Sequence, residues 1–166
     1  MLLDASVLIN FAHIQALGLL LSMETFRPAT TRVVASQVLN ETGRQQVQFA
    51  LRSGSIELVD ELIPAGLLPL VPGWVRRFGE QDTSLLINAL VLQATLGTDD
   101  RRLRTEAQRR GVASLATTED LLAELILARR LSLRQGNLKL VKLREVRFRA
   151  ACELAASLRC WSGEAV

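Results

Sequence analysis

Acidic residues recur along this chain where an apolar segment gives way to a helix. Asp4 follows the apolar residues 1–3, and Ser6 then opens a run with apolar side chains at helical spacing. Asp82 stands at the start of a long helix, and residues 98–100 (Thr-Asp-Asp) end a short apolar segment. In α/β proteins, chemistry concentrates where strands end and helices begin. These acids are therefore candidates for a shared site, although each alone is also a common helix cap.

Two glutamates extend this acidic set. Glu41 lies near the start of a helix that follows a second predicted strand, and Glu80 precedes Asp82 by two residues. Carboxylates gathered in one place repel one another unless cations lie between them. An oxygen-only site without histidine or cysteine suits Mg²⁺ or Mn²⁺. The alternative for each acid is a solvated helix residue or a turn.

The elements that position these acids follow from hydrophobic periodicity and from turn residues. We expect short strands at residues 1–3, 31–35, 56–59, 94–97 and 112–115. We expect a loop at 64–72 and helices at 6–21, from 36 onward, 45–52, 80–93, 101–110, from Thr117 or Thr118 to about 129, and 136–160. Strands that alternate with helices form a parallel sheet, whose carboxyl ends share one edge. The predicted fold is a three-layer α/β/α arrangement with a central, mostly parallel sheet and an extra C-terminal helix.

Composition and charge limit the classes of protein. The chain has 166 residues, 49% of them hydrophobic, which is enough for one domain with a core. Its apolar run at 16–21 is far too short to cross a membrane, and its two cysteines form no metal-binding motif, so we expect a cytoplasmic protein with no membrane partner. From Leu131 onward seven basic residues face three acids. Only Lys139 and Lys142 among the 20 basic residues are lysines, which favours phosphate contacts or reflects a G+C-rich genome.

Taken in order, these residues resemble the PIN-domain ribonucleases (PilT N-terminus), a family that includes VapC-type toxins. The opening segment 2–9 (Leu-Leu-Asp-Ala-Ser-Val-Leu-Ile) is similar to the family's first motif, and Glu41 is similar to its second acid. Asp82 before a helix and the ending at residues 98–100 are similar to its third acid and its Thr-x-Asp motif. The resemblance covers about residues 1–130, which we expect to form a PIN-like nuclease domain. Residues 131–166 would be a basic helical extension packed on it.

The resemblance implies a metal-dependent endoribonuclease that cleaves single-stranded RNA. Asp4, Asp82 and Asp100 would bind Mg²⁺ or Mn²⁺, with Glu41 as a further catalytic acid and Asp99 completing the cluster. Ser6, Thr98 and Glu80 would support these acids, and Glu80 could instead replace Asp82 as a ligand. Arginines near the site would bind the RNA, namely Arg76, Arg77, Arg101 and Arg102. The resemblance also implies an antitoxin-like protein partner and a homodimer.

Two other classes of function fit parts of the sequence. A phosphotransfer protein could use Asp4 as a nucleophile, but such proteins also need a lysine late in the sheet, and none occurs before Lys139. A non-catalytic RNA-binding or protein-interaction module could carry the same fold with acids that hold no metal. Metal-dependent cleavage of RNA separates the first reading from both alternatives.

Overall fold

A five-stranded parallel sheet forms the centre of the molecule in the computed structural model, which describes residues 1–38, 44–60 and 63–145. The strand order is β3-β2-β1-β4-β5, and every neighbouring pair is parallel. The strands are β1 (Leu2–Leu3), β2 (Ala29–Thr31), β3 (Glu57–Val59), β4 (Leu96–Gly97) and β5 (Leu115–Ala116). This arrangement confirms the predicted α/β fold.

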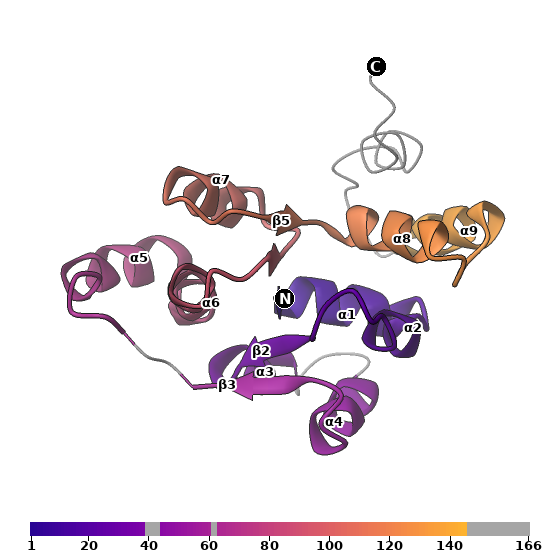
Figure 1. Ribbon diagram of the computed structural model, residues 1–166, viewed down its shortest axis with the longest axis horizontal. Coiled ribbons are helices and arrows are strands. Elements are labelled where there is room, and N and C mark those ends of the chain that lie inside the picture. Colours follow the sequence, from indigo (N-terminus) through magenta and orange to yellow (C-terminus); the bar gives the residue numbers. More distant parts are fainter. Residues whose placement is uncertain (39–43, 61–62, 146–166) are drawn as a thin grey trace.

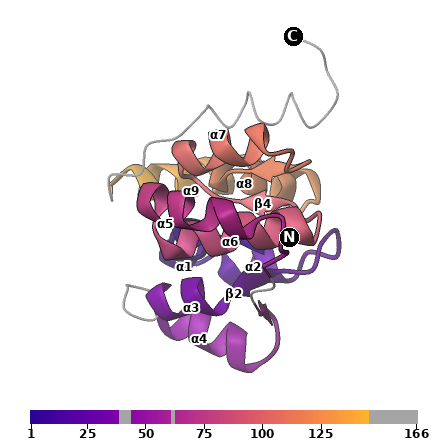
Figure 2. The same ribbon diagram turned by 90° about the vertical axis from the view of Figure 1, so that its left-hand side faces the viewer.

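Helices cover both faces of this sheet. Figure 1 shows α5, α6 and α7 on one side of the strands and α1, α2, α8 and α9 on the other. The helices are α1 (Ala5–His13), α2 (Leu17–Leu21), α3 (Arg32–Val38), α4 (Arg44–Arg52), α5 (Val71–Phe78), α6 (Glu80–Val91), α7 (Arg101–Arg109), α8 (Thr118–Leu127) and α9 (Leu133–Glu145), with a 3-10 turn η1 (Leu68–Leu70). In Figure 2, α7 and α4 lie at opposite ends of the molecule.

The central strand β1 is buried on both faces. Leu2 and Leu3 are 1% and 0% exposed, as expected for the middle of a parallel sheet. On the neighbouring strand, a Cβ added at Gly97 would lie 3.0 Å from Leu3 Cδ2, so the glycine permits a close approach of β4 to β1. Because β1 and β4 end side by side, Asp4 and Thr98 leave the sheet at the same edge.

Several boundaries differ from the sequence prediction for local reasons. The first predicted helix is broken after His13, where Gln15 takes a positive φ of 53°, yet Ile14 stays buried. The second strand ends at Thr31, and α3 begins at Arg32 rather than 36, because Thr31 Oγ1 accepts a hydrogen bond from Val34 N at 3.3 Å. A side-chain cap therefore overrides the strand preference of the valines here.

One further helix was not predicted, and another begins earlier than predicted. The expected loop at 64–72 ends at η1, and α5 starts at Val71 with Pro72 in its first turn, where a missing N–H costs little. The C-terminal helix α9 begins at Leu133, and the part of the predicted helix after residue 145 lies outside the described residues. Lys139 Nζ donates to Ile14 O at 2.8 Å, which fixes α9 to the end of α1. Within the described residues, no helix is long and apolar enough to span a membrane.

Candidate functional site

Asp4 lies at the carboxyl end of β1, at the N-cap position of α1. Its Oδ2 atom accepts a hydrogen bond from Ser6 Oγ and another from Thr98 Oγ1, both at 2.7 Å. Asp4 N also donates to Gly97 O at 2.9 Å, so the ends of β1 and β4 hold this carboxylate together. Because both hydroxyls bind the same oxygen, the orientation of the Asp4 carboxylate is fixed before any ligand arrives.

A charged carboxylate is unfavourable at this position. Burial raises the pKa of Asp4, and the charge of Asp99 raises it further. Hydrogen bonds from Ser6 and Thr98 act in the opposite direction without cancelling the effect of burial. The pKa of Asp4 therefore lies above its ordinary value, and a nearby cation would favour its charged form.

Asp82 carries the clearest sign that separate acids share this site. It stands in the first turn of α6, which the chain enters through Gly79 at a φ of 90°. Burial, followed by the charges of Asp4 and Asp100, raises the pKa of Asp82 to about 7, against a smaller opposing effect of Arg102. Acids from three separate segments thus repel one another. Glu80, the alternative ligand in the same turn, is exposed.

Asp100 serves as a helix cap at the edge of this site. Its Oδ1 atom accepts hydrogen bonds from Arg102 N at 2.6 Å and Leu103 N at 3.0 Å, and Asp100 N donates to Thr98 Oγ1 at 3.2 Å. The alternative prediction, that Asp100 is a helix cap, is therefore confirmed, and its Oδ1 atom is the capping atom. The hydrogen bonds from Arg102 N and Leu103 N both end on Oδ1 and do not involve Oδ2. The charge of Asp100 still acts on Asp82.

Asp99 joins three elements through both of its carboxylate oxygens. Oδ1 accepts a hydrogen bond from Thr118 N at 2.8 Å, while Oδ2 accepts from Asn10 Nδ2 at 2.9 Å and Thr118 Oγ1 at 2.5 Å. The side chain thereby holds α1 and the start of α8 against the end of β4. Asp99 was predicted to be a metal ligand, and Asn10 was not predicted as a site residue. The sequence did contain one indication of its role, because Asn10 is an amide side chain in a largely apolar helix.

The acids of this site are oxygen donors of the kind that bind hard divalent cations. Among residues 1–38, 44–60 and 63–145, no group of three or more acidic, histidine or cysteine side chains forms a ready-made metal site. Glu41, the second acid of the family resemblance, lies outside the described residues. Asp4 and Asp82 are oxygen donors whose pKa values are raised first by burial, with a further contribution from the charge of Asp99 at Asp4 and from the charges of Asp4 and Asp100 at Asp82. Such a set fits a hard divalent cation in its chemistry.

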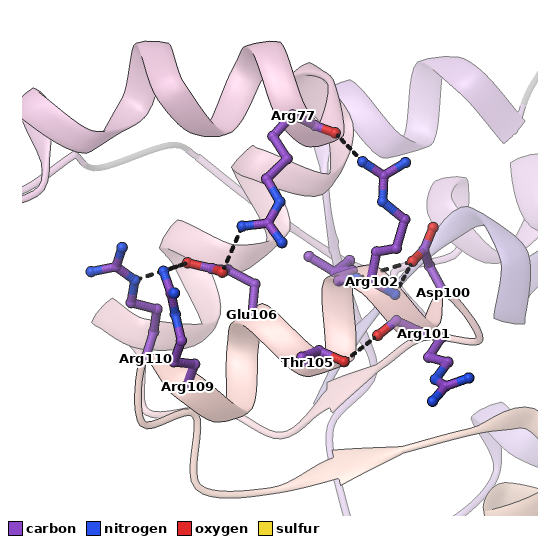
Figure 3. Close-up of polar contacts among 9 residues, drawn as sticks. Arg77, Asp100, Arg101, Arg102, Thr105, Glu106, Arg109 and Arg110 are labelled. Atoms are coloured by element: carbon purple, nitrogen blue, oxygen red, sulfur yellow. Dashed lines mark hydrogen bonds and ion pairs between the residues drawn. The ribbon is translucent and has the colours of Figure 1, made fainter.

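The four arginines proposed to bind RNA differ in their contacts. Arg77 Nη1 binds Glu106 Oε2 at 3.2 Å, and Arg102 Nη2 donates to Arg77 O at 3.0 Å (Figure 3). Arg76 Nε donates to Pro72 O in its own helix at 3.3 Å. Arg101 is exposed, and Figure 3 shows it turned away from Glu106. Glu106 is buried and was not predicted as a site residue, because it lies in a helix rich in arginine.

No protein-family model, curated protein or solved structure significantly matches this chain.

The raised pKa of Asp82 predicts that the metal-free protein loses stability as the pH rises. An acid whose pKa is about 7 when folded and near 3.8 when unfolded binds its proton more tightly in the folded state. Its contribution is thus fully present below about pH 4 and is lost progressively as the pH rises to about 7. Since Asp82 is only half-buried, we expect a decline of about 1–2 kcal/mol. Urea unfolding in EDTA at pH 5.5 and pH 8 measures this decline in the free energy of unfolding. Equal free energies at the two pH values would contradict the raised pKa of Asp82.

Proposed function

We propose that this chain is a metal-dependent endoribonuclease of the PIN type. The observation that supports it most is the electrostatic coupling of Asp82 to Asp4 and Asp100, which come from separate segments. Acids that cap unrelated helices far apart would not raise the pKa of a third acid, as Asp4 and Asp100 do for Asp82. The parallel sheet, with Asp4 and Thr98 at one edge, is compatible with the three-layer fold of that family. In this fold class ligands bind at that edge.

Each residue would have a separate task in this reaction. Asp4, Asp82 and Asp100 would hold Mg²⁺ or Mn²⁺, with Glu41 as a further acid. Ser6 and Thr98 orient the Asp4 carboxylate through its Oδ2 atom. Asp99, whose oxygens already accept protein hydrogen bonds, positions α1 and α8 rather than binding the cation. A bound divalent cation supplies an activated water and offsets negative charge at phosphorus, so the reaction needs no histidine base.

The expected substrate is single-stranded RNA, cleaved to leave a 5′-phosphate. Purified protein should cut a labelled unstructured RNA in the presence of Mg²⁺ or Mn²⁺, and EDTA should stop the reaction because the acids alone cannot activate water. Gel analysis of the products, with a phosphatase step to identify the 5′ end, measures both points. Cleavage that continues in EDTA would contradict the metal mechanism.

Further proposals from the resemblance are a cytoplasmic location, a homodimer and an antitoxin-like partner.

A non-catalytic RNA-binding or interaction module is the second candidate function. It is favoured by the engagement of Asp100 Oδ1 as a helix cap and of both Asp99 oxygens in protein contacts. The same cleavage assay separates the two functions. RNA that is bound but remains intact with Mg²⁺ and with Mn²⁺ would support the module.

A further inference from the structure

Three arginine side chains converge on one buried carboxylate where α5 lies beside α7. Glu106 is 3% exposed, and its Oε2 accepts a hydrogen bond from Arg77 Nη1 at 3.2 Å. Its Oε1 accepts from Arg109 Nη2 at 3.1 Å and from Arg110 Nε at 3.0 Å (Figure 3). Three positive charges therefore meet one negative charge. We call these four residues the Glu106 platform.

Aromatic side chains hold two of these arginines in place. The Arg110 guanidinium lies 5.3 Å from the ring centroid of Trp74, which is 4% exposed, and the Arg77 guanidinium lies 4.8 Å from that of Phe78. Such stacking limits the freedom of a guanidinium group. Burial raises the pKa of Glu106, but the hydrogen bonds and charges of Arg110 and Arg109 outweigh it. The carboxylate therefore stays charged near neutral pH and keeps the arginines together.

Most N–H groups of these arginines remain available. A guanidinium has five N–H donors, and each arginine directs one of its nitrogens at Glu106. The Arg77 and Arg109 side chains are 52% and 64% exposed, so their remaining donors reach solvent. A guanidinium fork matches two phosphate oxygens, and a fork that is already ordered loses little freedom on binding.

The Glu106 platform is connected to the acidic site by α7. Asp100 caps this helix, and Arg102 in its first turn binds the carbonyl oxygen of Arg77. The nine residues of α7 span about 12 Å at 1.5 Å per residue. A strand that enters the acidic site can therefore reach the platform along one helix. This placement favours a phosphodiester chain over an acidic protein as the ligand.

We propose that the Glu106 platform binds the sugar–phosphate backbone of single-stranded RNA beside the cleavage site, with Arg77 and Arg109 contacting phosphates and Glu106 positioning them. This inference rests on the proposed function, which supplies the RNA. It goes beyond that function by assigning a path for the strand over α7 and α5 and a role to a buried acid that sequence analysis did not identify.

Equilibrium RNA binding in EDTA tests the platform without requiring cleavage. Fluorescence anisotropy with a labelled unstructured RNA should show several-fold weaker binding for Arg77→Ala and for Arg109→Ala. The slope of log K against log salt should become shallower by about 0.7 for each phosphate contact that is lost. Arg52→Ala, an exposed arginine on α4 at the opposite end of the molecule, is the matched control and should bind as the wild type does. Unchanged affinity in both platform variants would overturn the proposal.

Glu106→Gln separates positioning from charge. The substitution removes one negative charge, so the net charge of the platform rises by one, yet it also removes the anion that orders the arginines. We expect weaker RNA binding, because the arginines are no longer held together. Tighter binding, which the gain in net charge alone would predict, would overturn the role of Glu106. Circular dichroism checks that this variant folds, and the exposed Arg109→Gln gives a second test if it does not. If the platform binds RNA but the protein never cleaves it, the nuclease function is wrong and the platform stands. If the arginine variants bind and cleave RNA as the wild type does, the platform is wrong and the nuclease function stands.

Discussion

Asp4→Asn lowers the rate of metal-dependent RNA cleavage by about 100-fold or more if the proposed site is correct. Asparagine retains an oxygen that can accept the hydrogen bonds of Ser6 and Thr98 but lacks the charge that holds a divalent cation. Losing a group that stabilises charge at the reacting centre costs about 10²–10³ in rate in other enzymes. Initial rates of RNA cleavage in Mn²⁺ measure the effect.

The same substitution should leave the fold intact. Because burial raises the pKa of Asp4, removing its charge takes an unfavourable group out of the interior. We therefore expect a melting temperature at or above that of the wild type in EDTA. Asp60→Asn is the matched control, since Asp60 follows β3, is exposed and pairs with Arg32 at 2.6 Å on the surface. Cleavage by Asp4→Asn at a rate close to that of Asp60→Asn would rule out Asp4 as a ligand.

Asp82→Asn should raise the melting temperature of the metal-free protein at pH 8. Two effects oppose each other, because an acid in the first turn of α6 interacts favourably with the helix dipole by about 0.3–1 kcal/mol. Burial and repulsion from Asp4 and Asp100 act the other way and are larger, at about 1–2 kcal/mol after allowing for partial exposure. The net gain corresponds to a rise of about 2–4 °C for a chain of this length.

A helix cap would behave differently from a repelled acid. Asn and Asp cap helices about equally well, so a capping role predicts almost no change. Glu80→Gln is the control, because Glu80 lies in the same turn but is exposed. Thermal melting of the three proteins in EDTA, repeated at pH 5.5, compares these readings. A melting temperature of Asp82→Asn that equals or falls below the wild type at pH 8 would argue against the repulsion.

The parts of the fold that follow from local patterns were predictable. The apolar face of α6 gave its bounds closely. Either Thr117 or Thr118 was predicted to begin α8, and Thr117 is the cap, where it forms a capping box with Asp120. The grouping of Asp4 and Thr98 followed from the rule that parallel strands end at one edge. These features depend on residues close in sequence or on general rules of α/β topology.

Contacts between distant residues could not be predicted. Asp99 is held by Asn10 and Thr118, which lie 89 and 19 residues away, so its spacing alone suggested a ligand. Glu106 lies in a helix rich in arginine, and only the packing of α5 against α7 reveals that it is buried. The valines of α3 favour a strand when the sequence is taken alone, and the structure shows that Thr31 instead caps a helix at this point. Each case depends on tertiary packing that a single sequence does not specify.

Thermal melting of the wild-type protein in EDTA and in millimolar Mn²⁺ tests most directly whether the acids form a cation site. A cation that binds only the folded state adds about 2.7 kcal/mol at a hundredfold excess over its dissociation constant. For a chain of this length we expect a rise of about 5–10 °C in Mn²⁺, and Asp82→Asn should lose most of it. A wild-type melting temperature that is the same in EDTA and in Mn²⁺ would contradict the metal site and would favour the non-catalytic module.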